Sequence, residues 1–89
     1  MEDVKSPYNI LLKPFVTEKS MLQIERENKI WFIVYEKATR DQIKNAVEEI
    51  SGMKVSNVNI LRDKEGKKAI VEISKDFSAE ELATKLGIF

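Results

Sequence analysis

The chain has 89 residues and a formal net charge of zero, because 15 Lys and Arg balance 15 Asp and Glu, and it contains neither His nor Cys. These absences exclude disulfides, thiolate nucleophiles, imidazole bases and Cys/His zinc sites, so an enzyme of this composition would depend on carboxylates, Lys or hydroxyls. An apolar fraction of 43% is enough for one modest core, and we expect a single domain over residues 1–89.

The first part of the chain predicts a strand followed by a helix. Residues 1–7 are expected to form a loose N-terminal end, and the apolar run at 10–12 stops at Lys13–Pro14, as a short strand would. Thr17 is placed to cap a helix whose apolar side carries residues 21, 22 and 24.

The middle of the chain predicts a buried strand and a capped helix. Residues 30–35 are dense in β-branched and aromatic side chains, which favours a strand. Thr39 and Gln42 fit a capping box, and Gly52 stands where a left-handed helix end belongs. Between these signals the apolar residues recur at helical spacing, at Ile43, Ala46, Val47 and Ile50.

The last third predicts a hairpin and a closing helix. Residues 53–62 and 67–74 are expected to be strands, joined by a turn at 63–66 in which Gly66 adopts a positive φ. Residues 78–81 resemble a second capping box, which would open a short helix that stops at Gly87.

The predicted order of elements is therefore β-α-β-α-β-β-α. This order favours an α+β fold, a small sandwich of two or three layers built on a four-stranded, largely antiparallel sheet. The order of the strands within the sheet does not follow from the pattern.

No segment predicts a membrane span or a secretion signal. The longest apolar runs, such as residues 31–35, are far shorter than the ~20 residues that a span needs. The acidic N-terminus lacks the basic and apolar zones of a signal peptide. We therefore expect a cytoplasmic, soluble protein without membrane insertion.

The charges are unevenly distributed along the chain. Residues 5–44 carry eight basic and five acidic side chains, and residues 54–68 carry five and two. The compensating carboxylates lie at residues 1–4, at 48–49 and after residue 71, so one basic and one acidic face are expected. A basic face would suit nucleic acid, because each phosphate that is neutralised releases counterions.

Mixed charge on an ordinary solvated surface would give a similar pattern, and that alternative stays open. Lys67 and Lys68 likewise have two interpretations from the sequence alone: they contact RNA, or they protect an edge strand from pairing with another chain.

The remaining candidates for chemistry are weak. Adjacent carboxylates at 48–49 and 80–81 point about 100° apart on a helix, so neither pair forms a shared-proton site. The glycines are too scattered for a phosphate loop, and Trp31 and Tyr35 fit core packing better than stacking on bases. We expect no enzymatic activity, no cofactor and no metal.

Four motifs in register resemble the family of large-subunit ribosomal protein twenty-three, in the short form typical of archaea. The resemblance spans residues 8–89 and rests on these segments: 12–20 (Leu-Lys-Pro-Phe-Val-Thr-Glu-Lys-Ser), 32–34 with 38–40 and 43–48, 54–59 (Lys-Val-Ser-Asn-Val-Asn) and 67–71 (Lys-Lys-Ala-Ile-Val). The closing residues 86–89 resemble the tail of archaeal members.

The resemblance implies a structural protein that binds large-subunit ribosomal RNA and forms part of the polypeptide tunnel exit. The implied partners are a neighbouring tunnel-rim ribosomal protein, the signal recognition particle and nascent-chain-associated factors, with Glu18 as the position for factor docking. The implied RNA-binding residues are Lys13, Lys19, Arg40, Lys44, Lys54, Asn57, Asn59, Lys67 and Lys68.

Two departures from the family pattern affect these expectations. Glu72 stands where the family has a basic residue or Thr, so that end of the strand is expected to face away from RNA. The turn at 63–66 is tight, where bacterial members carry a long basic extension, so it is not expected to probe the tunnel. A stand-alone protein-interaction or regulatory domain remains the alternative function.

Overall fold

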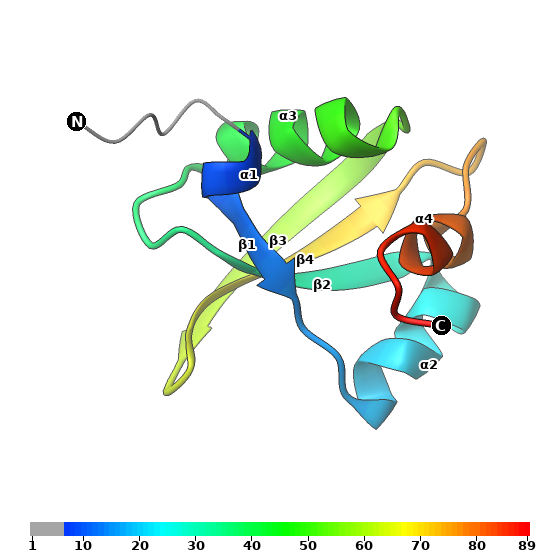
Figure 1. Cartoon of the computed structure of the whole chain (residues 1–89), viewed down its shortest axis with the longest axis horizontal. Coiled ribbons are helices and arrows are strands. Elements are labelled where there is room, and N and C mark those ends of the chain that lie inside the picture. The colour runs from blue at the N-terminus through cyan, green and yellow to red at the C-terminus, as the bar shows by residue number, and fades with distance from the viewer. Residues whose placement is uncertain (1–6) are drawn as a thin grey trace.

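A computed structural model describes residues 7–89, and Figure 1 shows the course of the chain. The elements are α1 (Pro7–Ile10), β1 (Leu11–Pro14), α2 (Glu18–Glu27), β2 (Lys29–Val34), α3 (Arg40–Ser51), β3 (Val55–Asp63), β4 (Gly66–Ile73) and α4 (Ala79–Lys85). Apart from α1, this order confirms the predicted one. The expected loose end at 1–7 lies outside the described residues except for Pro7, at which α1 begins.

The four strands form one antiparallel sheet with the order β1-β2-β4-β3. The α+β class and the four-stranded sheet are therefore confirmed, and the structure supplies the strand order that the sequence left open. The hairpin of β3 and β4 turns through Gly66, whose φ of 113° is the predicted positive value. β2 and β4 lie in the centre, while β1 and β3 are the edges.

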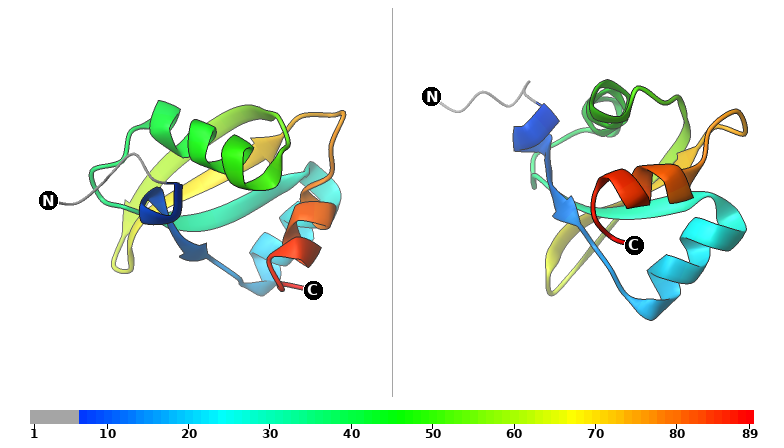
Figure 2. Two further views of the ribbon diagram at one scale, coloured as in Figure 1. Left: turned by 45° about the horizontal axis from the view of Figure 1, so that its top comes forward. Right: turned by 45° about the vertical axis from the view of Figure 1, so that its right-hand side comes forward.

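One face of the sheet carries the core. Because side chains alternate along a strand, this face takes every second residue of the two central strands: Ile30, Phe32 and Val34 from β2, and Ala69, Val71 and Ile73 from β4. Helices α3 and α4 cover it (Figure 2), and they contribute Ile43, Ala46, Val47, Leu82 and Ala83 to the same cluster. Helix α2 packs beside β2 and α4 and adds Ile24.

The opposite face, which we call the open face, carries side chains that are mostly half-buried or exposed. It consists of Trp31 and Ile33 of β2, Lys68, Ile70 and Glu72 of β4, and Asn57, Asn59 and Leu61 of β3, as the register places them. Lys68 is the buried member of this set.

Side-chain caps define the start of each longer helix. Thr39 Oγ1 accepts from the Gln42 N–H (3.2 Å) while Gln42 Oε1 accepts from the Thr39 N–H (2.9 Å), which confirms the predicted capping box of α3. Thr17 caps α2 through a reciprocal pair with Ser20. In α4 only half of the predicted box is present among the described residues: Ser78 Oγ accepts from the Glu81 N–H, and no bond returns.

Within the part of the chain that the structure describes, no helix has the length and apolar character needed to cross a membrane.

Candidate nucleic-acid interface

Two of the predicted cations lie on one side of α3. Arg40 and Lys44 are four residues apart, which places them on neighbouring turns of the same helix face. Both are exposed, and neither side chain has a hydrogen bond or ion pair with any residue of 7–89. Arg40 is the first residue of the helix, where the unpaired N–H groups already favour an anion. Together they offer two free positive charges at the start of α3.

Three further predicted cations are exposed on other elements and also lack a partner among the described residues. Lys13 lies on the edge strand β1, Lys19 in the first turn of α2, and Lys54 between α3 and β3. These side chains are available for contacts, but the structure distributes them over three elements and does not gather them with Arg40 and Lys44 into one cluster.

The predicted amides Asn57 and Asn59 lie on the open face of β3. In the register, Asn57 stands opposite Glu72 and Asn59 opposite Ile70. Both amides are exposed. The carboxylate beside Asn57 supports the expectation that this end of the strand is unfavourable for phosphate.

Lys68 is bound within the protein. Its side chain is 3% exposed, and its ammonium lies 2.6 Å from Asp63 Oδ2 and 3.1 Å from Glu65 Oε1. The same nitrogen lies 3.8 Å from the centre of the Phe15 ring, in a cation–π contact. The hydrogen bond to Asp63 raises the pKa of Lys68 and lowers the pKa of Asp63. The positive charge of Lys68 is therefore neutralised locally.

Lys67 points to the other face and binds the loop that precedes α3. Its ammonium donates to the carbonyl oxygens of Glu36 (3.2 Å) and Ala38. The interpretation of Lys67 and Lys68 as protection for an edge strand is wrong, because β4 lies between β2 and β3 in the sheet. Contact of either lysine with RNA stays a prediction.

Glu18, the predicted docking position, is exposed in the first turn of α2, where negative charge suits the helix dipole. Its carboxylate has no partner among the described residues. Two large apolar side chains of the same segment are also exposed, Val16 at 47% and Leu22 at 41%. A carboxylate and apolar side chains on one short segment are suited to contact with another protein.

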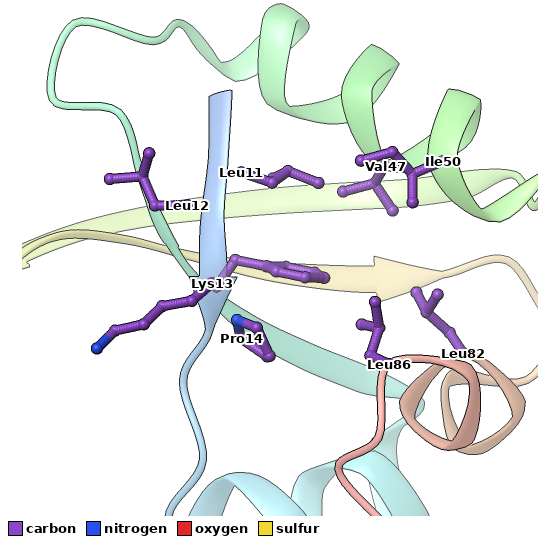
Figure 3. A pocket seen from close by; sticks show the side chains of 9 residues that line it. Leu11, Leu12, Lys13, Pro14, Val47, Ile50, Leu82 and Leu86 are labelled. Atoms are coloured by element: carbon purple, nitrogen blue, oxygen red, sulfur yellow. The ribbon is translucent and has the colours of Figure 1, made fainter. Parts of the chain in front are cut away.

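An apolar groove of about 180 Å³ lies between α3, α4 and β1 (Figure 3). Val47 and Ile50 of α3, Leu82 and Leu86 of α4, and Phe32 of β2 line it together with residues 11–14. Lys13 belongs to the lining segment, but Figure 3 shows its ammonium extending away from the apolar side chains. The groove offers apolar contact and no pair of groups that would carry out a reaction.

Asn28 is a structural residue that the sequence analysis missed. It ends α2 with a left-handed φ of 58°, and its amide joins α2 to the segment before α4. The amide nitrogen donates to the carbonyls of residues 73, 74 and 77, and the amide oxygen accepts from the Ala79 N–H at 2.7 Å. An Asn directly after a helical pattern is the one signal in the sequence that could have identified it.

Comparisons with known proteins agree on one family. The sequence model described as "Ribosomal protein L23" matches residues 9–76. A protein of Picrophilus torridus named "Large ribosomal subunit protein uL23" is 53% identical over 79 residues, which are 89% of this chain and 96% of that protein. Proteins of the same name from Thermoplasma acidophilum and Methanothermobacter thermautotrophicus are 46% and 42% identical, over 91% and 93% of this chain and 96% and 98% of their own lengths.

Proposed function

This chain belongs to the ribosomal protein L23 family, and from that premise we propose that it binds large-subunit ribosomal RNA beside the polypeptide tunnel exit. Proteins of this family are structural, non-enzymatic proteins of the large subunit in the cytoplasmic ribosome. The single observation that carries the proposal is the pair of exposed cations at the start of α3. Arg40 and Lys44 have no partner among residues 7–89, so their charge is available to phosphates.

The zero net charge is compatible with this function because the cations differ in what they already bind. Lys68 is neutralised by Asp63 and Glu65, whereas Arg40 and Lys44 lose no internal ion pair when they meet a phosphate. Contact of Arg40 and Lys44 with phosphates therefore breaks no ion pair within the described residues. Lys13, Lys19 and Lys54 extend the set of available cations, and Asn57 and Asn59 provide amide groups for polar contacts.

The test is a titration of the purified protein with large-subunit ribosomal RNA at several salt concentrations. The variant Arg40→Gln/Lys44→Gln removes both charges without removing a described internal contact. The matched control is Lys75→Gln/Lys85→Gln, which removes two exposed charges outside α3, one in the loop before α4 and one in its last turn. Each lost phosphate contact lowers the slope of log affinity against log salt by roughly 0.7 to 0.9.

We expect the α3 variant to lower that slope by about 1.5 and the control to leave it unchanged. An equal slope for the α3 variant and the natural protein would contradict phosphate contact at this face. No binding of the natural protein at any salt concentration would favour the alternative, a protein-interaction domain.

For protein partners we propose docking at the segment around Glu18. The exposed carboxylate beside the exposed side chains of Val16 and Leu22 supports contact with the signal recognition particle, nascent-chain-associated factors or a neighbouring tunnel-rim ribosomal protein. The test compares ribosomes that carry Glu18→Gln with ribosomes that carry Glu25→Gln, an exposed carboxylate later in the same helix. Weaker binding of signal recognition particle with the first variant alone supports docking there, and equal binding contradicts it.

A further inference from the structure

The hairpin of β3 and β4 holds the loop that leads into α3. Arg62 and Lys67 stand opposite each other in the register, and both reach residue 36. Arg62 Nη1 lies 3.2 Å from Glu36 Oε1, and Arg62 Nη2 lies 3.4 Å from the Glu36 carbonyl oxygen. Lys67 Nζ donates to the same carbonyl and to that of Ala38. Two cations of the hairpin thus bind two residues of one loop, Glu36 and Ala38.

The held loop ends at the cap of α3. Ala38 is 2% exposed, its N–H donates to the Tyr35 carbonyl, and its own carbonyl accepts from Lys67, so both of its backbone polar groups are bound. The next residue, Thr39, caps the helix, and Arg40 begins it. A displacement of the Ala38 carbonyl would therefore turn the capping residue and move the first turn of α3.

Lys67 differs from Arg40 and Lys44 in how its donors are used. An ammonium has three N–H donors, and two of those of Lys67 donate to backbone carbonyls. The Lys67 side chain is also half-buried. A phosphate would have to compete with those carbonyls. This geometry links the hairpin to the loop before α3 within the protein.

We propose that Lys67 is a positioning residue for the RNA contact at α3: by binding the carbonyls of Glu36 and Ala38, it holds the first turn of α3 so that Arg40 and Lys44 meet the phosphates. The inference rests on the proposed function and assigns to the hairpin a role in that same interface. It also replaces direct phosphate contact as the role of Lys67.

The experiment combines a double-mutant cycle in RNA binding with amide hydrogen exchange of the free protein. Lys67→Met keeps the aliphatic stem and removes the donors, and Lys64→Met is the matched control, since Lys64 is exposed in the turn and binds no described residue. With two hydrogen bonds lost, we expect exchange at the amides of residues 38–43 to be about fivefold to tenfold faster in Lys67→Met and unchanged in Lys64→Met.

In RNA binding, Lys67→Met is expected to weaken affinity in the natural background and to have no further effect in the Arg40→Gln/Lys44→Gln background. Lys67→Arg, which can donate to two carbonyls, should return both the exchange rates of residues 38–43 and the RNA affinity to those of the natural protein. If Lys67→Met does not fold, Lys67→Gln, which keeps one amide donor group, takes its place in the cycle.

Three results overturn the inference in distinguishable ways. If Lys67→Met weakens binding equally in both backgrounds, or leaves the exchange of residues 38–43 unchanged, then Lys67 contacts RNA itself or does not hold the loop. If Arg40→Gln/Lys44→Gln has no effect on RNA binding, the contact at α3 fails and the positioning role fails with it, even where exchange is faster.

Discussion

At the scale of single residues, Asn28 shows how one side chain can join two distant segments. Its amide supplies two donors and one acceptor to a segment that lies 45 to 51 residues further along the chain. Its backbone adopts a left-handed φ of 58°, a conformation that Asn and Gly tolerate best. The residue therefore satisfies backbone groups before α4 and ends α2 at the same time.

Replacement of Asn28 should be among the most destabilising changes in the chain. Asn28→Gly keeps the backbone conformation but loses the side-chain hydrogen bonds, so we expect the free energy of unfolding to fall by about 2–4 kcal/mol. Asn28→Ala should cost about 1 kcal/mol more, because a Cβ is unfavourable at this φ. Urea denaturation measures both. Asn59→Ala, at an exposed strand position, should stay within about 0.5 kcal/mol, and an equally small effect of Asn28→Gly would contradict the structural role.

The Lys68–Asp63 pair predicts a specific pH dependence. The pKa of Asp63 lies below its ordinary value of 3.8 because of the hydrogen bond from Lys68. The stabilisation from ionised Asp63 is therefore complete above about pH 3.8 and is lost as the pH falls through the lowered pKa. The pKa of Lys68 is raised above 10.5, so its contribution is complete below that pH and is lost only at more alkaline values.

Denaturation of the natural protein and of Asp63→Asn over a pH series tests this. The difference in the free energy of unfolding should be constant at neutral pH and shrink toward zero in acid, where the natural Asp63 is also uncharged. In a Lys68→Met background this pH dependence should be weaker, because only the hydrogen bond from the Glu65 N–H then lowers the pKa of Asp63. A difference that grows as the pH falls would mean that Asp63 has a raised pKa.

At the scale of elements, α3 is the best-defined unit because both of its ends have a local cause. The capping box at Thr39 begins it, and Gly52, with a φ of 72°, ends it in the left-handed conformation. Thr39→Ala leaves the Gln42 N–H without its acceptor, so we expect a loss of about 1 kcal/mol. For a domain of this size that loss lowers the midpoint of thermal unfolding by about 4–8 °C.

The control for this prediction is Thr84→Ala. Thr84 is exposed within α4, and its hydroxyl donates back to the Glu80 carbonyl, an arrangement that adds little to a helix. Ala has the higher helix propensity, so this variant should be neutral or slightly more stable. If both variants lowered the midpoint by the same amount, the cap of α3 would not be a special source of stability.

The elements that the sequence predicted correctly are those whose signals are local. The caps at Thr17 and Thr39 and the positive φ of Gly66 each depend on a few neighbouring residues. The strand order and α1 depend on contacts between distant segments: α1 is a single turn that packs against α3. No periodicity can appear in four residues.

The same distinction explains the candidate site. From the sequence alone, Lys44, Lys67 and Lys68 cannot be told apart as cations. The partners of a side chain depend on the strand register and on the face of the sheet that it takes, and the sequence gives neither. In the structure, Lys44 has no partner among the described residues, Lys67 donates hydrogen bonds to backbone carbonyls, and Lys68 is buried beside Phe15. Tertiary structure alone assigns these different environments.

At the scale of the whole molecule, the two cations proposed to bind RNA and a group of carboxylates lie far apart. The loop at residues 35–39, which leads into Arg40 and Lys44, and the loop at 74–78, which leads into α4, lie at the two ends of the long axis (Figure 1). That axis measures 38 Å. Because Asn28 joins α2 to the segment before α4, the carboxylates of both are gathered at the second end: Glu25, Glu27, Asp76, Glu80 and Glu81.

This separation predicts how neutralisation of two of these carboxylates affects RNA binding. Glu80→Gln/Glu81→Gln raises the net charge from zero to plus two, yet at 0.15 M salt the screening length is about 8 Å. If RNA lies at the start of α3, charges far along the 38 Å axis are screened, and affinity should not change at that salt concentration. At 0.01 M salt the screening length is about 30 Å, and affinity should rise by a few fold.

Titrations of the two proteins at both salt concentrations measure the effect. The control Glu36→Gln neutralises a carboxylate beside the proposed interface, whose partner is Arg62, and should raise affinity at 0.15 M salt as well. A rise of equal size for Glu80→Gln/Glu81→Gln at 0.15 M salt would place the first turn of α4 against the RNA and would contradict an interface centred on Arg40 and Lys44. Screening thus lets two variants of this chain determine which end of the protein meets the phosphates.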